Sequence, residues 1–231
     1  MAEITKNLKC ERCCLKQDIF SLLTNEEMRI IDQNRHEVNF RTGETIFKQG
    51  AALTHIACIT RGFGKIYIEG YNNKNLILKI FKNNEFIGGP GMYTDFMLHY
   101  TVSALTDVST CFIDARIFYQ TVKSNSAFAI QMLGHINRMS IHNFHKFVNL
   151  TQKHMHGRIA DAIFYLADRI HESDDFETPI SRQDLADMTA MTKESAIRIL
   201  KDLKDNQTMS VEGNHFRILN RVALEKISRT G

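Results

Sequence analysis

The first half of the chain alternates apolar and polar residues with the short period of β-strands. Runs such as TIFKQG, HIACITRG, GKIYIEGY and NLILKIF recur between about Val38 and Asp114. Turn-forming residues separate these runs at positions 41–44, 61–62 and 70–75. Because such spacing is typical of an all-β sandwich or barrel, the pattern predicts an antiparallel, jelly-roll-like barrel.

From Arg116 onward the period becomes helical, and residues 126–150 carry two apolar stripes whose members step by three or four positions. The stripes are Ile130, Leu133, Asn137, Ile141, Phe144 and Val148, and Met132, Ile136, Met139, Asn143, Phe147 and Leu150. At about 100° per residue the two stripes lie roughly 200° apart around one helix. We expect one side to pack on the barrel and the other to pair with a second chain, although a central helix inside a monomer would also bury both sides. The two asparagines within the stripes are of the kind that fixes register in coiled coils.

The pattern breaks at residues 153–157, where we expect the hinge, and an amphipathic helix follows over 159–170 until the polar run at 171–175. We therefore predict an α+β fold in three parts. They are a β-barrel sensor domain over 1–125, a dimerisation helix over 126–152 and a winged helix-turn-helix domain over 153–231.

Two short helices with a tight turn are predicted in residues 179–206. Ser181 is placed to cap the first helix, with Asp184 three residues on, and Thr192 is placed to cap the second. The small Ala186 would let the two helices approach closely, as in a helix-turn-helix. A β-hairpin follows, with Met209–Val211 and Phe216–Leu219 as its strands, and makes the motif winged.

The outward face of the second helix has the chemistry to read a major groove. Arg198 suits a guanine, Glu194 suits a cytosine amine, and Lys193 and Ser195 can reach a base edge or a phosphate. The predicted DNA-binding residues are Ser181, Arg182, Gln183, Thr192, Lys193, Glu194, Ser195 and Arg198. The alternative is an ordinary amphipathic helix in which Glu194 and Arg198 form an ion pair. On the wing, His215 and Arg217 either touch phosphates or form part of a solvated tip.

Composition changes this picture little. The chain has 231 residues, 43% of them hydrophobic, and a net charge of +3, which permits nucleic-acid binding without requiring it. No stretch reaches the roughly 20 apolar residues of a membrane span, and the first ten residues lack a signal-peptide core. We therefore expect a cytoplasmic protein without a membrane partner, whose five cysteines are not paired in structural disulfides.

Over nearly its full length the chain resembles the CRP/FNR family of bacterial transcription regulators. The resemblance rests on Gly43-Glu44, Arg61-Gly62, Glu85-Phe86-Ile87-Gly88, the long helix, and the run SRQDLA and MTKESAIRILKDL. It implies a cyclic-nucleotide-binding-like barrel, a homodimer that bends palindromic double-stranded DNA, and RNA polymerase as a partner. It also implies that Glu194 and Arg198 read TTGA or GTGA half-sites. Ala190 departs from the glycine that is frequent in the family's turn.

The barrel departs from the family's cyclic-nucleotide binders. Its loop reads Gly88-Gly89-Pro90-Gly91, without the glutamate that binds the ribose, and the phosphate end reads Tyr100-Thr101 instead of an Arg-Ser or Arg-Thr pair. Without that arginine a phosphate lacks its charge-assisted partner. We predict that cAMP is not the effector, and Gly88, Gly89, Tyr100 and Thr101 then mark either a pocket for another ligand or a filled, vestigial one.

Four cysteines are candidate ligands of an iron-sulfur cluster, which the FNR branch of the family uses to sense oxygen. They are Cys10, Cys13, Cys14 and Cys111. Cys13 and Cys14 are adjacent, an awkward spacing for two ligands of one cluster, and the further cysteine expected near Ile19 is missing. Thiol redox sensing, or no sensing role, are the alternatives. Cys58 is interpreted as a small buried hydrophobe.

Two other classes of function compete with a DNA-binding regulator. A cupin-like metal enzyme would need clustered ligands in the barrel, but His36, His55 and His99 are far apart in the sequence. His154 and His156 have a closer spacing but lie at the predicted hinge. A sensor that binds only protein partners would keep the fold and lack affinity for DNA.

Overall fold

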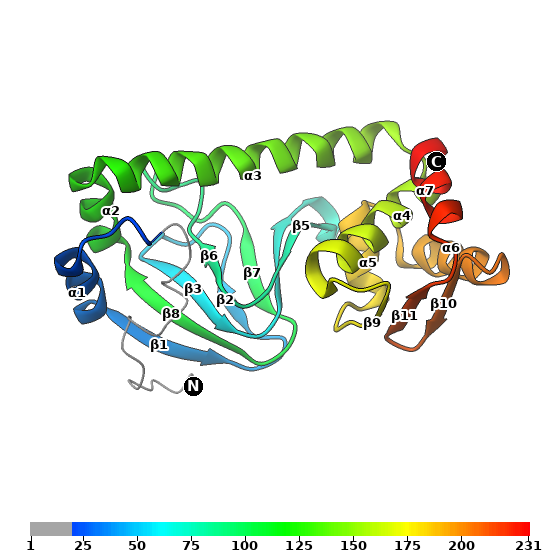
Figure 1. The fold of residues 1–231 in the computed structure, drawn as a ribbon, viewed down its shortest axis with the longest axis horizontal. Helices are drawn as coiled ribbons and strands as arrows, with labels where there is room; N and C mark the ends of the chain where they lie inside the picture. Colours follow the sequence, from blue (N-terminus) through cyan, green and yellow to red (C-terminus); the bar gives the residue numbers. More distant parts are fainter. Residues whose placement is uncertain (1–19) are drawn as a thin grey trace. The chain divides into compact units, whose positions relative to one another are not determined.

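The computed structural model describes residues 20–231, which form two compact units (Figure 1). One unit contains the described residues up to Ile68 together with Ile80–Ile141, and the other contains Glu69–Lys79 and His142–Gly231. The long helix therefore contributes residues to both units.

The β-rich part of the chain consists of two four-stranded sheets. One has the strand order β1-β8-β3-β6 and the other has the order β2-β7-β4-β5. The strands are β1 (Arg35–Phe40), β2 (Thr45–Phe47), β3 (His55–Arg61), β4 (Gly64–Glu69), β5 (Asn75–Phe81), β6 (Glu85–Ile87), β7 (Thr101–Ala104) and β8 (Val108–Asp114). The pairings within each sheet that involve β1, β2, β3, β6, β7 and β8 are antiparallel, as the alternating pattern predicts.

The turns predicted from the sequence are present in the structure. Gly43 and Gly62 have positive φ angles of 87° and 95°, and a short 3-10 turn spans Tyr71–Asn73. At Gly62 an added Cβ would lie 2.3 Å from the backbone oxygen of Asp107, so glycine is needed there for space as well as for conformation.

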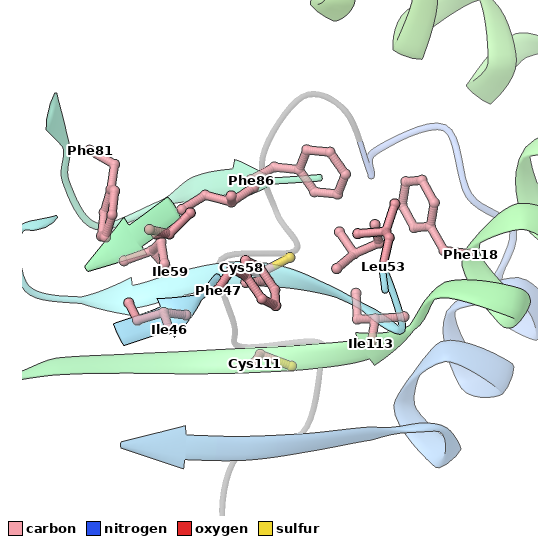
Figure 2. Packing of buried hydrophobic residues seen from close by; sticks show 14 of the residues in the cluster. Ile46, Phe47, Leu53, Cys58, Ile59, Phe81, Phe86, Cys111, Ile113 and Phe118 are labelled. Atoms are coloured by element: carbon pink, nitrogen blue, oxygen red, sulfur yellow. The ribbon is translucent and has the colours of Figure 1, made fainter. Parts of the chain in front are cut away.

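The core of the first unit is aromatic and aliphatic. Phe47 stacks on Phe112 with ring centroids 5.2 Å apart, and Phe86 stacks on Phe118 of α2 (Ala115–Ser124) at the same distance. Figure 2 shows Phe86 and Phe118 turned toward one another beside the strands. Packing of this kind fixes the strand that carries residues 85–88 against the helix that follows the barrel.

Helix α3 (Ser126–Gln152) has the bounds of the predicted dimerisation helix. Its first turns are anchored in the core of the first unit by Phe128 and Met132, which are both buried. All members of the first predicted stripe are exposed in the single chain, with Ile130 69% and Phe144 61% accessible. The second stripe is mixed, because Met132 is buried whereas Ile136 and Phe147 are exposed.

The C-terminal elements form the predicted winged helix-turn-helix. They are α4 (Met155–Tyr165), a π-helical turn (Leu166–His171), β9 (Asp175–Glu177), α5 (Arg182–Thr189), α6 (Lys193–Asp205), β10 (Met209–Glu212), β11 (His215–Ile218) and α7 (Arg221–Thr230). The wing is three-stranded, in the order β10-β11-β9, because β9 pairs with β11 in addition to the predicted hairpin. Ala186 on α5 and Ala196 on α6 are fully buried, as expected where two helices approach closely.

Two helices were not predicted. Helix α1 (Asn25–Gln33) begins at a capping box in which Thr24 and Glu27 satisfy each other's backbone, and α7 begins at Asn220, whose side chain accepts a hydrogen bond from the backbone of Ala223. Both helices are short and each buries few residues, but both are amphipathic. Their apolar spacing and their caps were the available signals.

Ala190 closes α5 in a left-handed conformation, with φ 51° and ψ 49°, and Met191 donates its backbone N–H to the carbonyl of Ala186 at 3.1 Å. An L-residue with a side chain is strained there. We expect Ala190→Gly to raise the free energy of unfolding by about 1 kcal/mol, measured by urea denaturation of the full chain.

The matched control for Ala190→Gly is Gly213→Ala in the turn of the wing. Gly213 has φ 57°, and an added Cβ there would meet no atom within 4 Å, so the substitution introduces backbone strain alone. It should lower the free energy of unfolding by about 1 kcal/mol. A fall rather than a rise for Ala190→Gly would show that the turn is not under strain.

Candidate nucleic-acid interface and effector pocket

Helix α6 presents the predicted reading residues at its N-terminal end. Thr192 caps the helix, with its side-chain oxygen accepting a hydrogen bond from the backbone N–H of Ser195 at 3.2 Å. Lys193, Glu194 and Arg198 are exposed. The opposite side of the helix is buried through Ala196, Ile199, Leu200 and Leu203. The core thus fixes the rotation of α6 and leaves its charged side open.

The alternative of a Glu194–Arg198 ion pair does not hold in this structure. Among the described residues, neither side chain forms an ion pair or a hydrogen bond, although the i,i+4 spacing would allow one. Both groups are therefore available to an external partner.

The Ser195 side chain already forms a hydrogen bond within its own helix. Its side-chain oxygen is the acceptor of a hydrogen bond from the Thr192 hydroxyl at 3.1 Å, and the residue is partly buried. A phosphate or base would reach Ser195 only in addition to this bond, so its candidate role is weaker than that of Lys193 or Arg198.

Two candidate DNA-binding residues at the start of α5 also form hydrogen bonds with neighbouring residues of the same helix. Ser181 caps the helix, and its hydroxyl donates to the Asp184 carboxylate at 2.6 Å. Gln183 is exposed and its side-chain amide donates to Asp187 at 2.8 Å. These residues share the N-terminal turn of α5 with Arg182.

Arg182 connects α5 to the wing. Its guanidinium donates to the carbonyl of Gly213 at 2.6 Å and lies over the Phe216 ring, 4.9 Å from the centroid. Burial lowers the pKa of this guanidinium from its usual value. The contact orients the wing relative to the helix-turn-helix, a role that the sequence pattern did not indicate.

The charged side chains on the wing are tied to one carboxylate. Arg217 pairs with Asp175 at 2.7 Å, and His215 approaches the same carboxylate at 2.5 Å. The hydrogen bond from Arg217 lowers the pKa of Asp175. The wing is therefore closer to an internally paired surface than to a free phosphate-binding tip.

Ile197 was not among the residues predicted to contact DNA. This residue lies between the buried Ala196 and the exposed Arg198, and its side chain is 46% accessible. An exposed isoleucine beside the reading residues has the chemistry to contact a thymine methyl group. The sequence did contain an indication of this role, because Ile197 is an apolar residue on the otherwise charged, outward side of the predicted helix.

The four candidate effector residues of the barrel lie together. The buried Tyr100 donates its hydroxyl to the carbonyl of Gly88 at 2.9 Å, and an added Cβ on Gly89 would lie 3.9 Å from that hydroxyl. Thr101 is fully buried, and its side-chain oxygen accepts a hydrogen bond from the backbone of Gln49 at 3.0 Å. Burial raises the pKa of Tyr100 well above its usual value, so this group stays neutral.

Cys111 is the one cluster candidate within the described residues, since Cys10, Cys13 and Cys14 lie outside them. It is fully buried on β8, directly opposite Cys58 on β3, as the neighbouring strands in Figure 2 show. The Arg35 guanidinium donates toward its sulfur at 3.6 Å and also pairs with Asp32 and Glu37. The sequence analysis did not anticipate that the two barrel cysteines share one register position.

Within residues 20–231, the structure contains no group of three or more histidine, cysteine or acidic side chains placed to bind a metal ion. His36 and His55, distant in the sequence, do meet with ring centroids 5.1 Å apart. Over the same residues no helix is long and apolar enough to cross a bilayer.

Comparison with known proteins matches both halves of the chain. The family model "Cyclic nucleotide-binding domain" matches residues 37–125, and "Crp-like helix-turn-helix domain" matches residues 157–227. The cAMP-activated global transcriptional regulator CRP of Salmonella typhimurium is 25% identical over 182 residues, covering 77% of this chain and 87% of that protein. The transcriptional activator protein FnrL of Cereibacter sphaeroides is 20% identical over 228 residues, covering 93% of this chain and 89% of that protein.

The fold agrees with these matches. The structure of FixK2 from Bradyrhizobium japonicum superposes with a TM-score of 0.76 at 16% identity, covering 84% of this chain and 98% of that chain. Two family models in the order seen here, the exposed charged face of α6 and the shared architecture lead to one conclusion. The chain belongs to the CRP/FNR family of transcription regulators.

Proposed function

We propose that this protein binds double-stranded DNA as a homodimer and regulates transcription from palindromic operators. Helix α6 enters the major groove, where Arg198, Glu194 and Lys193 contact base edges and Ile197 contacts a thymine methyl. Thr192, Ser195, Ser181, Arg182 and Gln183 supply or support contacts to the phosphates of the flanking backbone.

One observation supports this reading most strongly. The N-terminal turns of α6 expose two cations and an acceptor whose side chains have no partner among the described residues, on a helix whose other side is held by a packed core. A solvated helix face would be expected to satisfy Glu194 and Arg198 with each other. A rigid helix with unpaired polar groups is the arrangement that direct readout of bases requires.

The exposed stripe on α3 supports pairing of two chains. Ile130, Leu133, Ile141, Phe144 and Val148 are each at least 48% accessible. Their three- and four-residue spacing keeps them on one side of the helix, so two antiparallel or parallel copies can bury them against each other. A two-fold dimer presents two recognition helices, which predicts half-sites about one helical turn apart.

The experiment is selection from a random duplex library with the full chain, followed by gel shift at several salt concentrations. A palindromic consensus related to TTGA or GTGA half-sites, bound by two chains, is the expected result. Affinity that is weak, independent of sequence and removed by moderate salt would favour a sensor that acts only through protein partners.

We propose further that the signal is not cAMP. Tyr100 occupies the position where the resemblance places a phosphate-binding arginine, and its hydroxyl is already bonded to Gly88. A cyclic phosphate entering there would break that bond without gaining the charge-assisted hydrogen bonds of the arginine that Tyr100 replaces, so its desolvation would be poorly compensated.

Calorimetric titration of the full chain with cAMP is therefore expected to show no submicromolar binding. The same preparation should retain sequence-specific DNA binding without added cAMP, which serves as the control for folded protein. A saturable heat signal at submicromolar cAMP would contradict the proposed reading of the barrel.

The cysteines define the remaining candidate signal. Cys111 supplies one of the four thiols that a cluster would use, and the guanidinium beside it suits a thiolate as well as a cluster ligand. Because the other three candidate cysteines lie outside the described residues, the proposed function includes no cluster chemistry. Anaerobic purification with an absorption spectrum and iron and sulfide assays distinguishes free thiols from an iron-sulfur cluster, because charge-transfer bands in the visible range accompany a cluster.

By resemblance to the family, RNA polymerase is the expected protein partner.

A further inference from the structure

A basic cavity lies within the second compact unit, away from the reading face of α6. It has a volume of about 200 Å³ and is bordered by β5, the C-terminal half of α3, α4 and the end of α5. The charged side chains and histidines that line it are Lys79, His142, His145, Lys146, Arg158 and Asp161. Five of these six groups carry or can carry a positive charge.

The Lys146 ammonium is held in this cavity without a carboxylate partner. It donates to the backbone carbonyl of Ile77, and to that of Leu78 at 3.4 Å. Its burial lowers the pKa of Lys146 to about 8. Carbonyl dipoles stabilise an ammonium less than an anion does. An anion bound beside Lys146 would therefore stabilise the charged ammonium further.

His142 lies in the field of the same cations. Its pKa is lowered first by burial and then by Lys146, Lys79 and His145, while a hydrogen bond with the backbone of Leu78 acts in the opposite direction. No carboxylate contributes to raising it. The positive potential of the cavity therefore acts on the His142 ring as well as on the Lys146 ammonium.

The one acidic group on the wall is already neutralised. Both carboxylate oxygens of Asp161 accept hydrogen bonds from Lys153, at 2.9 and 2.7 Å, and one also accepts from Ser228 at 2.5 Å. Arg158 donates to the backbone carbonyls of Lys153 at 2.9 Å and Thr189 at 3.4 Å. Lys146 and Arg158 therefore donate to backbone carbonyls, whereas the one carboxylate on the wall is paired with Lys153, which is not part of the lining.

We propose that this cavity binds a small phosphate-bearing anion, either inorganic phosphate or a small phosphomonoester. Lys146 and the two histidines would meet the phosphate, and the apolar walls made by Leu150 and Ala162 would contact an organic group. This volume is below the roughly 300–1,000 Å³ usual for pockets that hold drug-sized ligands, so it suits a phosphate with a short organic group better than a nucleotide. Its lining shares no residue with the candidate effector residues of the barrel or with the candidate DNA-binding residues of α5 and α6.

The test is thermal unfolding of the full chain without DNA, in potassium phosphate and in potassium chloride of equal ionic strength. Phosphate is expected to raise the Tm of the wild type over chloride. Lys146→Met, which keeps the aliphatic stem and removes the charge, should bind phosphate at least tenfold more weakly and lose that rise. Lys123→Met removes one charge from an exposed position on α2 and should keep it.

A second measurement covers the case in which Lys146→Met does not fold. In the wild type, the ring proton resonances of His142 and His145 should move saturably with added phosphate, whereas those of His36 and His55 in the barrel should follow chloride alone. Glycerol 3-phosphate in place of phosphate shows whether the organic group adds affinity. The proposal is overturned if phosphate gives the wild type no rise beyond chloride, if Lys146→Met keeps the full rise, or if His142 and His145 respond as the barrel histidines do.

Discussion

Arg198→Ala is expected to weaken binding to the selected operator by roughly 5- to 150-fold, or about 1 to 3 kcal/mol, and to relax the preference at one guanine of each half-site. Arg198 is exposed on α6 without a partner among residues 20–231, so nothing within the fold competes for its guanidinium. Alanine is a good helix former, and the buried side of α6 is untouched. The loss therefore reports the missing contact to the base rather than a change in the fold.

The measurement is a competition gel shift against operators that carry each of the four bases at the affected position. Arg229→Ala is the matched control, because it removes an arginine from an exposed position on α7 and should change affinity little for every sequence. If Arg198→Ala weakens all four operators equally, the arginine contacts a phosphate and the proposed base readout is wrong.

Phe144→Glu should convert the dimer to single chains at concentrations where the wild type is paired. Phe144 is 61% accessible in the single chain and lies in the C-terminal half of the exposed stripe. A two-fold interface would bury two glutamates for each dimer, and each unpaired carboxylate costs several kcal/mol on burial. We expect the dissociation constant of the dimer to rise by roughly 100-fold or more, which is about 3 kcal/mol at 1.4 kcal/mol for each factor of ten.

Sedimentation equilibrium measures this change directly, and operator affinity should fall with it because one recognition helix binds half a site. Gln131→Glu places the same carboxylate on α3 outside both apolar stripes and should leave the mass unchanged. A Phe144→Glu protein that remains paired would show that the chains meet through another surface.

Periodicity was sufficient to predict the parts of this fold in which one face of each element is buried. The strands from Val38 to Asp114, the bounds of α3 and the turn between α5 and α6 all follow from spacing, because a buried face forces apolar residues to recur at the period of the backbone. The reading face of α6 follows for the same reason. Once Ile199 and Leu203 are assigned to the core, Glu194 and Arg198 must point outward.

Contacts between distant segments could not be predicted in this way. Arg182 was a candidate for DNA contact by its position, yet its side chain is held by Gly213, 31 residues further on. Likewise Arg217 is paired with Asp175, and Cys58 meets Cys111 only through the pairing of β3 with β8. Such pairs depend on strand register and on the approach of separate elements, neither of which leaves a local pattern in one sequence.

The apolar stripe on α3 also links this regulator's activity to its own abundance. Under the proposed pairing, the stripe is covered only when two copies meet, so mass action sets the fraction of molecules able to bind an operator. Well below the dissociation constant, the amount of paired protein grows with the square of the copy number. A modest change in synthesis or degradation then produces a steeper change in promoter occupancy, before any effector acts.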